Sequence, residues 1–213
     1  MRLSSPGRAK DPFSAALDAL RHQLRGGQLI LGEPLTITDL AEDLGLSATP
    51  VREALSRLAG EGLIEDRRGR GYFARRIDVA DLVELYGLRS LYLVGALGIG
   101  DGGAAQDGGD PQAEPAGTAT GELIRRFDRL MAQAGNRALL DAYKLVADRL
   151  APAMAVEASI LPADDVVAAF DAGLSARDRA ALKHLLVTHH RARQAAAGEI
   201  VRAMRGRSNI SNL

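Results

Sequence analysis

The chain has 213 residues, 46% of them hydrophobic, and a formal net charge of zero, so it is long enough for two small domains that each bury a core. It contains no cysteine, which excludes disulfide frameworks and thiolate zinc sites and is compatible with a reducing compartment. The first residues lack the apolar run of a signal peptide, and no stretch approaches the roughly 20 apolar residues of a membrane span. We therefore expect a cytoplasmic protein with no membrane partner.

The neutral total conceals one strongly basic segment. Residues 1–76 hold 12 Lys and Arg against 10 Asp and Glu, whereas the stretch DRRGRGYFARR at residues 66–76 has five arginines and one aspartate. A short basic segment of this kind is the electrostatic footprint that phosphate binding requires. Tryptophan is absent and aromatic residues make up only 4% of the chain, which disfavours the stacking platforms that bind single strands.

Two helices are predicted in the first part of the chain. Residues 1–11 are polar, and we expect a solvated tail there. From Pro12 the apolar residues recur every three or four positions until a Gly-Gly pair ends the helix. After a turn, a helix of about two turns follows, in which Thr36 and Asp39 approximate a capping box and Gly45 provides the stop.

The stretch LSATPVREALSRLAGEGL, residues 46–63, predicts a third helix. Ser47 suits the N-cap, Pro50 falls in the first turn, where its missing N–H costs nothing, and Gly62 suits a left-handed stop. Apolar residues recur at the helical period, while Thr and Arg side chains lie on the other faces. By itself the pattern fits a recognition helix for the DNA major groove or an ordinary amphipathic surface helix, and the neighbouring elements favour the first.

After this helix the pattern changes to two short extended pieces, residues 63–65 and 72–74, joined by the turn RRGRG. Two strands with a turn rich in glycine and arginine predict a β-hairpin, and in this position the hairpin is a wing. Glycine allows the backbone to approach a phosphate closely, and arginine supplies the charge. Three helices and a basic wing in this order predict a winged helix-turn-helix module.

The residues of this module also carry a family resemblance. The series G-E-P-L-T, D-L-A-E-D-L-G-L-S-A-T-P-V-R-E-A-L-S-R-L-A-G-E-G-L-I and R-R-G-R-G-Y-F, within residues 13–76, resembles the DNA-binding domain of the GntR family of bacterial transcription regulators. The resemblance implies a homodimer on a pseudo-palindromic operator, with Arg52 contacting bases or phosphates and Gly69 and Gly71 at the wing tip. Many members have an arginine where this sequence has Ala48, so the operator does not follow from relatives.

The residues expected to contact double-stranded DNA lie on the second and third helices and on the wing. They are Thr38, Ser47, Thr49, Pro50, Arg52, Ser56, Arg57, Arg67, Arg68, Gly69, Arg70 and Gly71.

The rest of the chain predicts an all-helical domain. Residues 78–98 are apolar almost all round, as in a helix that is buried on most sides or shared with a partner subunit. The segment E-L-Y-G-L-R-S-L-Y-L resembles the opening helix of the effector domain in the FadR-like branch of the same family. Residues 98–121 are rich in Gly, Ala, Asp and Pro and predict a flexible loop, which makes the domain a reduced one. Further helices are expected at 122–135, 136–160, 164–172 and 175–204, the last with Ser175 at its N-terminus and a frayed tail after it.

We therefore predict a mainly α protein: a winged helix-turn-helix domain at residues 1–76 and an all-helical domain at 77–213 for dimerisation and effector binding. A pocket between its helices is a plausible site for a small metabolite. Arg89 interrupts an otherwise apolar helix, and if it faces inward the ligand should be an anion. The alternatives are a domain that only dimerises, and candidate residues that merely lie at a surface or interface. The candidate lining is Arg89, Tyr92, Arg125, Tyr143, His189 and His190.

Neither a metal site nor an enzyme is expected. Many FadR-like effector domains hold a divalent cation with an Asp and three His, but Leu123 and Phe127 stand at the first two of these positions here. His184, His189 and His190 do not converge either, because five and six residues correspond to ~140° and ~240° around a helix. No cysteine nucleophile, no phosphate loop of Walker spacing and no dinucleotide motif between a strand and a helix is present, so we expect no cofactor. A helical metal-dependent enzyme that uses these three histidines is the rival hypothesis.

Overall fold

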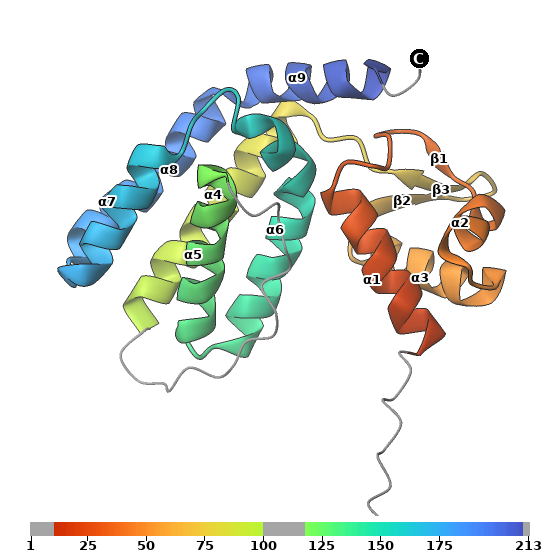
Figure 1. Cartoon of the computed structure of the whole chain (residues 1–213), viewed down its shortest axis with the longest axis horizontal. Coiled ribbons are helices and arrows are strands. Elements are labelled where there is room, and N and C mark those ends of the chain that lie inside the picture. Colours follow the sequence, from red (N-terminus) through yellow and green to blue (C-terminus); the bar gives the residue numbers. More distant parts are fainter. Residues whose placement is uncertain (1–10, 100–117, 211–213) are drawn as a thin grey trace, which may run out of the picture. The chain divides into compact units, whose positions relative to one another are not determined.

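The computed structural model describes residues 11–99 and 118–210, and the chain divides into two compact units, Met1–Arg76 and Ile77–Leu213 (Figure 1). Each unit has its own core and is described by itself. The predicted N-terminal tail and most of the predicted flexible loop lie outside the described residues.

The first unit is a small helical module with a β-sheet at one side. Its helices are α1 (Pro12–Arg25), α2 (Ile37–Leu44) and α3 (Ala48–Gly60). α1 packs against α3, and α2 also packs against α3. The apolar faces that meet there are fully buried, with Ala16 and Leu20 on one side and Val51, Leu55 and Leu58 on the other. Burial of this single stripe orients α3, because a helix with one apolar face has only one stable way to lie on the core.

The helix boundaries follow the predicted caps only in part. Asp11 caps α1, its carboxylate accepting the Ser14 N–H at 3.3 Å. Thr36 and Ser47 do occupy the N-cap positions of α2 and α3, but neither side chain makes a capping hydrogen bond. The predicted capping box at Thr36 is therefore wrong, since N-cap geometry alone does not aim a side chain at the backbone. Gly45 has φ +63°, the left-handed conformation that the sequence predicted for this stop.

The wing is a three-stranded antiparallel sheet rather than the two-stranded hairpin that was predicted. Strands β2 (Ile64–Arg67) and β3 (Gly71–Ala74) form the hairpin, and β1 (Pro34–Leu35) pairs with the other edge of β3. Strand β1 has only two residues, and one of them is a proline. Such a strand shows no alternation of apolar and polar residues, so the sequence indicated only a turn there. The extra strand ties the wing to the segment before α2.

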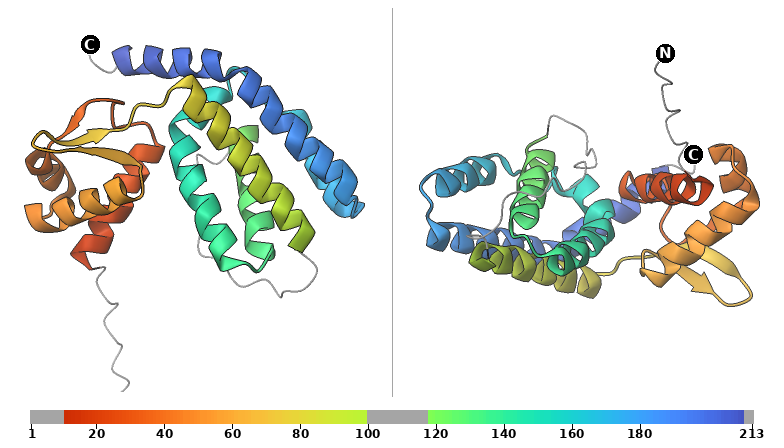
Figure 2. Two further views of the ribbon diagram at one scale, coloured as in Figure 1. Left: turned by 180° about the vertical axis from the view of Figure 1, so that it is seen from behind. Right: turned by 90° about the horizontal axis from the view of Figure 1, so that it is seen from below.

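The second unit consists of helices in the described ranges: α4 (Val79–Ile99), α5 (Ala119–Gln133), α6 (Arg137–Glu157), α7 (Asp164–Ser175), α8 (Arg179–Ala195) and α9 (Ala197–Ile210). α4 packs against α5, α6, α8 and α9, and both views in Figure 2 show it running beside α8. Among the described residues α4 is also the one helix long and apolar enough to cross a membrane by length and composition, although no such stretch was expected. A helix at the centre of a bundle passes the same test.

Two boundaries in this unit differ from the sequence prediction. The loop predicted at residues 98–121 extends too far toward the C-terminus, because α5 already begins at Ala119. Thr118 is its N-cap and accepts the Gly121 N–H at 3.1 Å. The predicted helix 175–204 is two helices: Ser175 ends α7, Asp178 is the N-cap of α8, and Ala196 separates α8 from α9. Three alanines at the second break hide it from a periodicity argument, because alanine favours helix on either side. The tail expected to fray from residue 205 continues as helix to Ile210.

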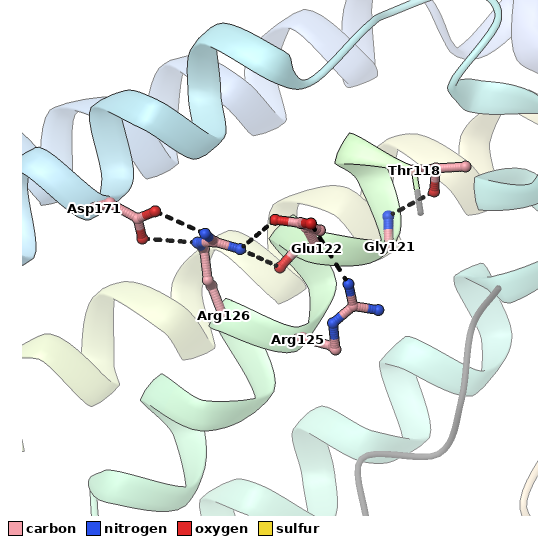
Figure 3. A network of polar contacts seen from close by, with 6 residues as sticks. All are labelled: Thr118, Gly121, Glu122, Arg125, Arg126 and Asp171. Carbon is pink, nitrogen blue, oxygen red and sulfur yellow. Dashed lines mark hydrogen bonds and ion pairs between the residues drawn. The ribbon is translucent and has the colours of Figure 1, made fainter. Parts of the chain in front are cut away.

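An arginine on α5 joins the beginning of that helix to α7 (Figure 3). Arg126 donates two hydrogen bonds of 2.7 Å to the two carboxylate oxygens of Asp171 and one of 3.1 Å to Glu122. Paired hydrogen bonds to one carboxylate fix the guanidinium plane as well as its charge. The contact holds α5 against α7 beside the aromatic pair Phe127 and Phe170, whose ring centroids are 5.7 Å apart.

The corrected helix boundary gives a test. Asp178→Ala should lower the free energy of unfolding by about 1 kcal/mol, because the Asp178 carboxylate accepts the Ala181 N–H at 2.9 Å at the start of α8. Ser175→Ala, at the position that the sequence favoured, should change it by less than about 0.5 kcal/mol. Urea unfolding of both variants would measure this, and the opposite order of the two effects would contradict the boundary.

Candidate functional site

The solvent face of α3 carries the polar residues that the sequence placed there. Thr49, Arg52 and Ser56 are exposed, while the opposite face of the helix is buried in the core. Arg52 makes no ion pair with any residue that the structure describes. Ser47 is exposed at the N-cap without a capping bond, so its hydroxyl and the first backbone N–H groups of α3 are available to a phosphate oxygen.

The wing presents two arginines around its tip. Arg68 and Arg70 are exposed in the turn between β2 and β3, which is closed by a hydrogen bond of 2.7 Å from the Arg70 N–H to the Arg67 carbonyl. Gly69 and Gly71 have φ values of +72° and +88°, so both glycines are needed for this turn. The tip therefore combines an accessible backbone with two charges that a phosphate can neutralise.

Two other predicted DNA contacts are already held by carboxylates. Arg57 donates to Glu61 at 2.7 Å, and Arg21 of α1 also pairs with Glu61. Arg67 donates to Glu65 at 2.9 Å, and its guanidinium carbon lies 4.1 Å from the centre of the Phe73 ring. These ion pairs give both guanidinium groups a carboxylate partner within the unit, although the Arg57 side chain remains 64% exposed.

The other residues predicted to contact DNA are Thr38 and Pro50. Thr38 is exposed on α2 and its hydroxyl donates to Asp39 at 3.2 Å. Pro50 is half-buried in the first turn of α3, where its fixed φ helps to start the helix.

Comparison with known proteins agrees with this geometry. Residues 13–73 match the model of the bacterial regulatory proteins of the gntR family. The chain is 30% identical over 201 residues to the "Probable D-xylose utilization operon transcriptional repressor" of Paenarthrobacter nicotinovorans, covering 83% of this chain and 84% of that protein. The chain belongs to the GntR family. It is a transcriptional regulator of the GntR type, and its relatives carry the names of regulators rather than enzymes.

Other proteins are similar to this chain over a short stretch of sequence or over most of its fold. The Nta operon transcriptional regulator of Aminobacter aminovorans is 42% identical over 59 residues, 28% of each chain. Among solved structures, Escherichia coli McbR/YncC has a TM-score of 0.62 at 20% identity and covers 89% of this chain and 98% of its own. A GntR regulator of Rhodococcus sp. RHA1 has a TM-score of 0.61 at 19% identity, covering 87% and 96%. The fold of this GntR protein is thus that of regulators with a helical C-terminal domain, as in the FadR-like branch.

Inside the helical unit, Arg89 does face inward, as the effector hypothesis required. Its side chain on α4 is only 2% exposed. Nε donates to Nε2 of His190 on α8 at 3.0 Å, and Nη1 donates to the thioether of Met154 on α6 at 3.0 Å. The rings of Tyr86 and Phe127 lie 5.4 and 5.8 Å from the guanidinium carbon. A buried guanidinium with a neutral imidazole and a weak sulfur acceptor as partners is not neutralised.

Next to Arg89 lies a complete buried ion pair that the sequence analysis missed. Glu157 at the end of α6 pairs with Arg193 of α8 and accepts the Tyr86 hydroxyl at 2.7 Å. Burial and the Glu157 carboxylate raise the pKa of Tyr86 above its usual range. Glu157 and Arg193 each lie on an amphipathic helix, and a charged residue on such a helix usually faces solvent. No local pattern therefore identified the pair. It joins α4, α6 and α8 at one point.

Two adjacent histidines complete this region, and both are buried and neutral. Burial, with nearby guanidinium groups, holds the pKa values of His189 and His190 well below the usual range. Nδ1 of His190 lies 2.7 Å from the Leu186 carbonyl and must be the protonated nitrogen, which leaves Nε2 to accept from Arg89. Nδ1 of His189 is buried without a hydrogen-bond partner among the described residues.

The other predicted ligand residues separate into two groups. Tyr143 is buried beside the cluster and donates to Asp128 at 2.9 Å, and Tyr92 is half-buried against the helical core. Arg125 is a third exposed on α5 and lies 4.0 Å from Glu122, so it belongs to the network in Figure 3. His184 is exposed, and no group of three metal-binding side chains lies together in the described ranges.

The buried histidines predict a pH dependence. Their folded-state pKa values lie below the unfolded value of about 6.5, so the unfolded state binds more protons and stability falls as the pH drops below 6.5. At pH 5.5 each should lower the free energy of unfolding by about 1 kcal/mol relative to neutral pH. Urea unfolding between pH 7.5 and 5.5 measures the loss. His189→Asn should remove about half of this loss, and a loss in the variant equal to that of the wild type would contradict the assignment.

Proposed function

We propose that this GntR regulator binds a pseudo-palindromic operator as a homodimer, and that a small anion bound in the helical unit modulates its affinity for DNA. The observation that carries the first part is the exposed polar face of α3, whose other face is locked in the core. Base-reading side chains must be exposed on an element rigid enough to fix their position in the major groove. As a regulator of bacterial DNA it acts in the cytoplasm, and nothing in its motifs supports catalysis.

The residues divide into base-reading and phosphate-binding roles. Arg52, Thr49 and Ser56 project from the solvent face of α3 and are assigned to base edges. The wing arginines Arg68 and Arg70 are assigned to phosphates or the adjacent groove, where charge matters more than direction. Ala48 has no polar atom to contribute, so specificity depends on the three α3 side chains and on DNA shape.

Dimerisation is assigned to the outer face of α4. Of the large apolar side chains that are exposed in the described residues, all but Leu174 lie on this helix: Val79, Val83, Leu91 and Ile99. Steps of four and eight residues turn each side chain by about 40° or 80° from the one before it, so neighbours in the row share a face while the row winds about 200° round the helix from Val79 to Ile99. An apolar row of this kind on an otherwise packed helix marks a protein interface, and a second copy is the partner that a symmetric operator requires.

The effector proposal rests on the charges of three buried residues, Arg89, Arg193 and Glu157. Arg89 has no carboxylate partner within the described residues, whereas Arg193 has Glu157. An anion that binds one arrangement of α4, α6 and α8 better than another shifts the population between them, and through α4 this reaches the chain segment that leads to the DNA-binding unit.

Replacing Arg52 tests the recognition helix. Arg52→Ala should weaken operator binding by about 1–3 kcal/mol and relax the base preference, because a bidentate base contact is lost. Arg68→Ala should weaken all duplexes alike and lower the salt slope by about one. Fluorescence anisotropy on an operator selected from random DNA measures both, with exposed Arg137→Ala of α6 as the control. Wild-type affinity in Arg52→Ala would contradict the assignment.

Replacing Leu91 tests the dimer. Leu91 is 65% exposed in a single chain, so Leu91→Glu should leave the monomer folded but raise the dimer dissociation constant by roughly 30-fold or more, as for a hot-spot loss of about 2 kcal/mol. Sedimentation equilibrium with circular dichroism measures both properties. Leu174→Glu on α7 is the matched control and should remain dimeric. A dimeric Leu91→Glu protein, or a monomeric wild type, would contradict the proposal.

A further inference from the structure

The fold family implies a divalent cation held by an Asp and three His in the helical unit, and the residues present do not fit one. The lone pair of His190 Nε2 accepts from Arg89, and its Nδ1 faces the Leu186 carbonyl, so neither nitrogen is free to coordinate a metal. The Phe127 ring stacks on His190, with centroids 5.8 Å apart, and meets His189 edge-on at 5.7 Å. An aromatic ring occupies the space beside the imidazoles that a metal and its ligands would need.

The same region nevertheless carries a buried positive charge. Apart from the phenols of Tyr86 and Tyr143, whose pKa values burial raises, the buried ionisable side chains of the described residues are two guanidinium groups, one carboxylate and two neutral imidazoles. Arg193 and the Tyr86 hydroxyl use the carboxylate of Glu157. One positive charge, that of Arg89, remains without an anion, and burying such a charge is costly unless an anion completes the site.

We infer that the Arg89 guanidinium replaces the metal ion of the family in this chain, so that the site binds a small monocarboxylate directly and without any metal. The inference rests on the effector binding proposed above and specifies its chemistry. One unbalanced positive charge selects a single negative charge, and a planar guanidinium matches a planar carboxylate through two parallel hydrogen bonds.

The donors needed for this contact are free or weakly engaged. Arg89 uses Nε for His190 and Nη1 for the Met154 sulfur, and its Nη2 makes no hydrogen bond to a described residue. A thioether is a weak acceptor, so a carboxylate oxygen that replaces it gains a charge-assisted hydrogen bond. The ring of His189 lies next to that of His190, with centroids 5.0 Å apart. Its Nδ1 has no hydrogen-bond partner among the described residues and is a second polar group that a ligand oxygen or hydroxyl can satisfy.

The experiment uses the full-length protein in EDTA and measures the melting temperature with sodium acetate, L-lactate or benzoate against sodium chloride at equal ionic strength. We expect at least one carboxylate to raise Tm in a saturable way, because a ligand that binds only the folded state stabilises it by mass action. Adding Zn²⁺, Ni²⁺ or Mn²⁺ in place of EDTA should not change this rise. Arg89→Gln, which keeps an N–H donor but loses the charge, should abolish it.

The controls decide between the outcomes. Arg89→Lys keeps the charge without the planar fork and should weaken carboxylate binding at least tenfold, whereas Arg137→Gln on α6, whose side chain is 94% exposed, should leave it unchanged. The inference is overturned if no carboxylate raises Tm, if the rise needs a metal, if phosphate matches the carboxylates, or if Arg89→Gln or Arg89→Lys binds like wild type. Operator binding is measured on the same samples. A wild-type protein that does not bind the operator would count against the proposed function. A wild-type protein that binds the operator but no carboxylate would count against this inference alone.

Discussion

The arrangement of the helical unit depends on how it accommodates buried charge. Glu157 accepts from both Arg193 and Tyr86, and these three side chains connect α4, α6 and α8. Breaking a buried pair of this kind typically costs about 3–5 kcal/mol, because one charge is left uncompensated. The pair therefore sets the relative position of the helices that surround Arg89, and Arg89 itself remains the one buried cation of the described residues without a carboxylate.

Coupling between the two units has a simple physical route in this chain. α4 begins at Val79, directly after the segment that follows the wing, and the same helix carries Tyr86 and Arg89. A ligand that shifts the contacts of Arg89 acts on the helix whose N-terminal end is continuous with the DNA-binding unit. The outer face of α4 carries the apolar row assigned to the dimer, so the proposed effector and partner contacts would share one helix, which residues 77 and 78 connect to the DNA-binding unit.

The inferred replacement of the metal ion by Arg89 rests on the surroundings of the two imidazoles. With Phe127 against His190 and His189, the imidazoles lie in an apolar environment that keeps them neutral, and a guanidinium supplies a permanent positive charge that no chelator removes. Arginine suits this role because it stays charged even when it is buried and offers a fork of donors. The same burial should make the protein less stable in acid, because it holds the pKa values of both imidazoles below their usual range.

The sequence by itself determined the DNA-binding unit, because local signals specify it: the apolar period of α1 and α3, the stop at Gly45, and the glycines that the wing tip requires. These depend on residues a few positions apart, whereas the sequence left open whether Arg89 faces inward. Only the tertiary structure decided the partners of that arginine. His190 is far along the chain from Arg89, and Glu157 meets Arg193 across two helices. Such contacts follow from how helices pack, which no local pattern records. The short strand β1 and the break at Ala196 were missed for another reason, because two residues with a proline and a run of alanines give no local signal.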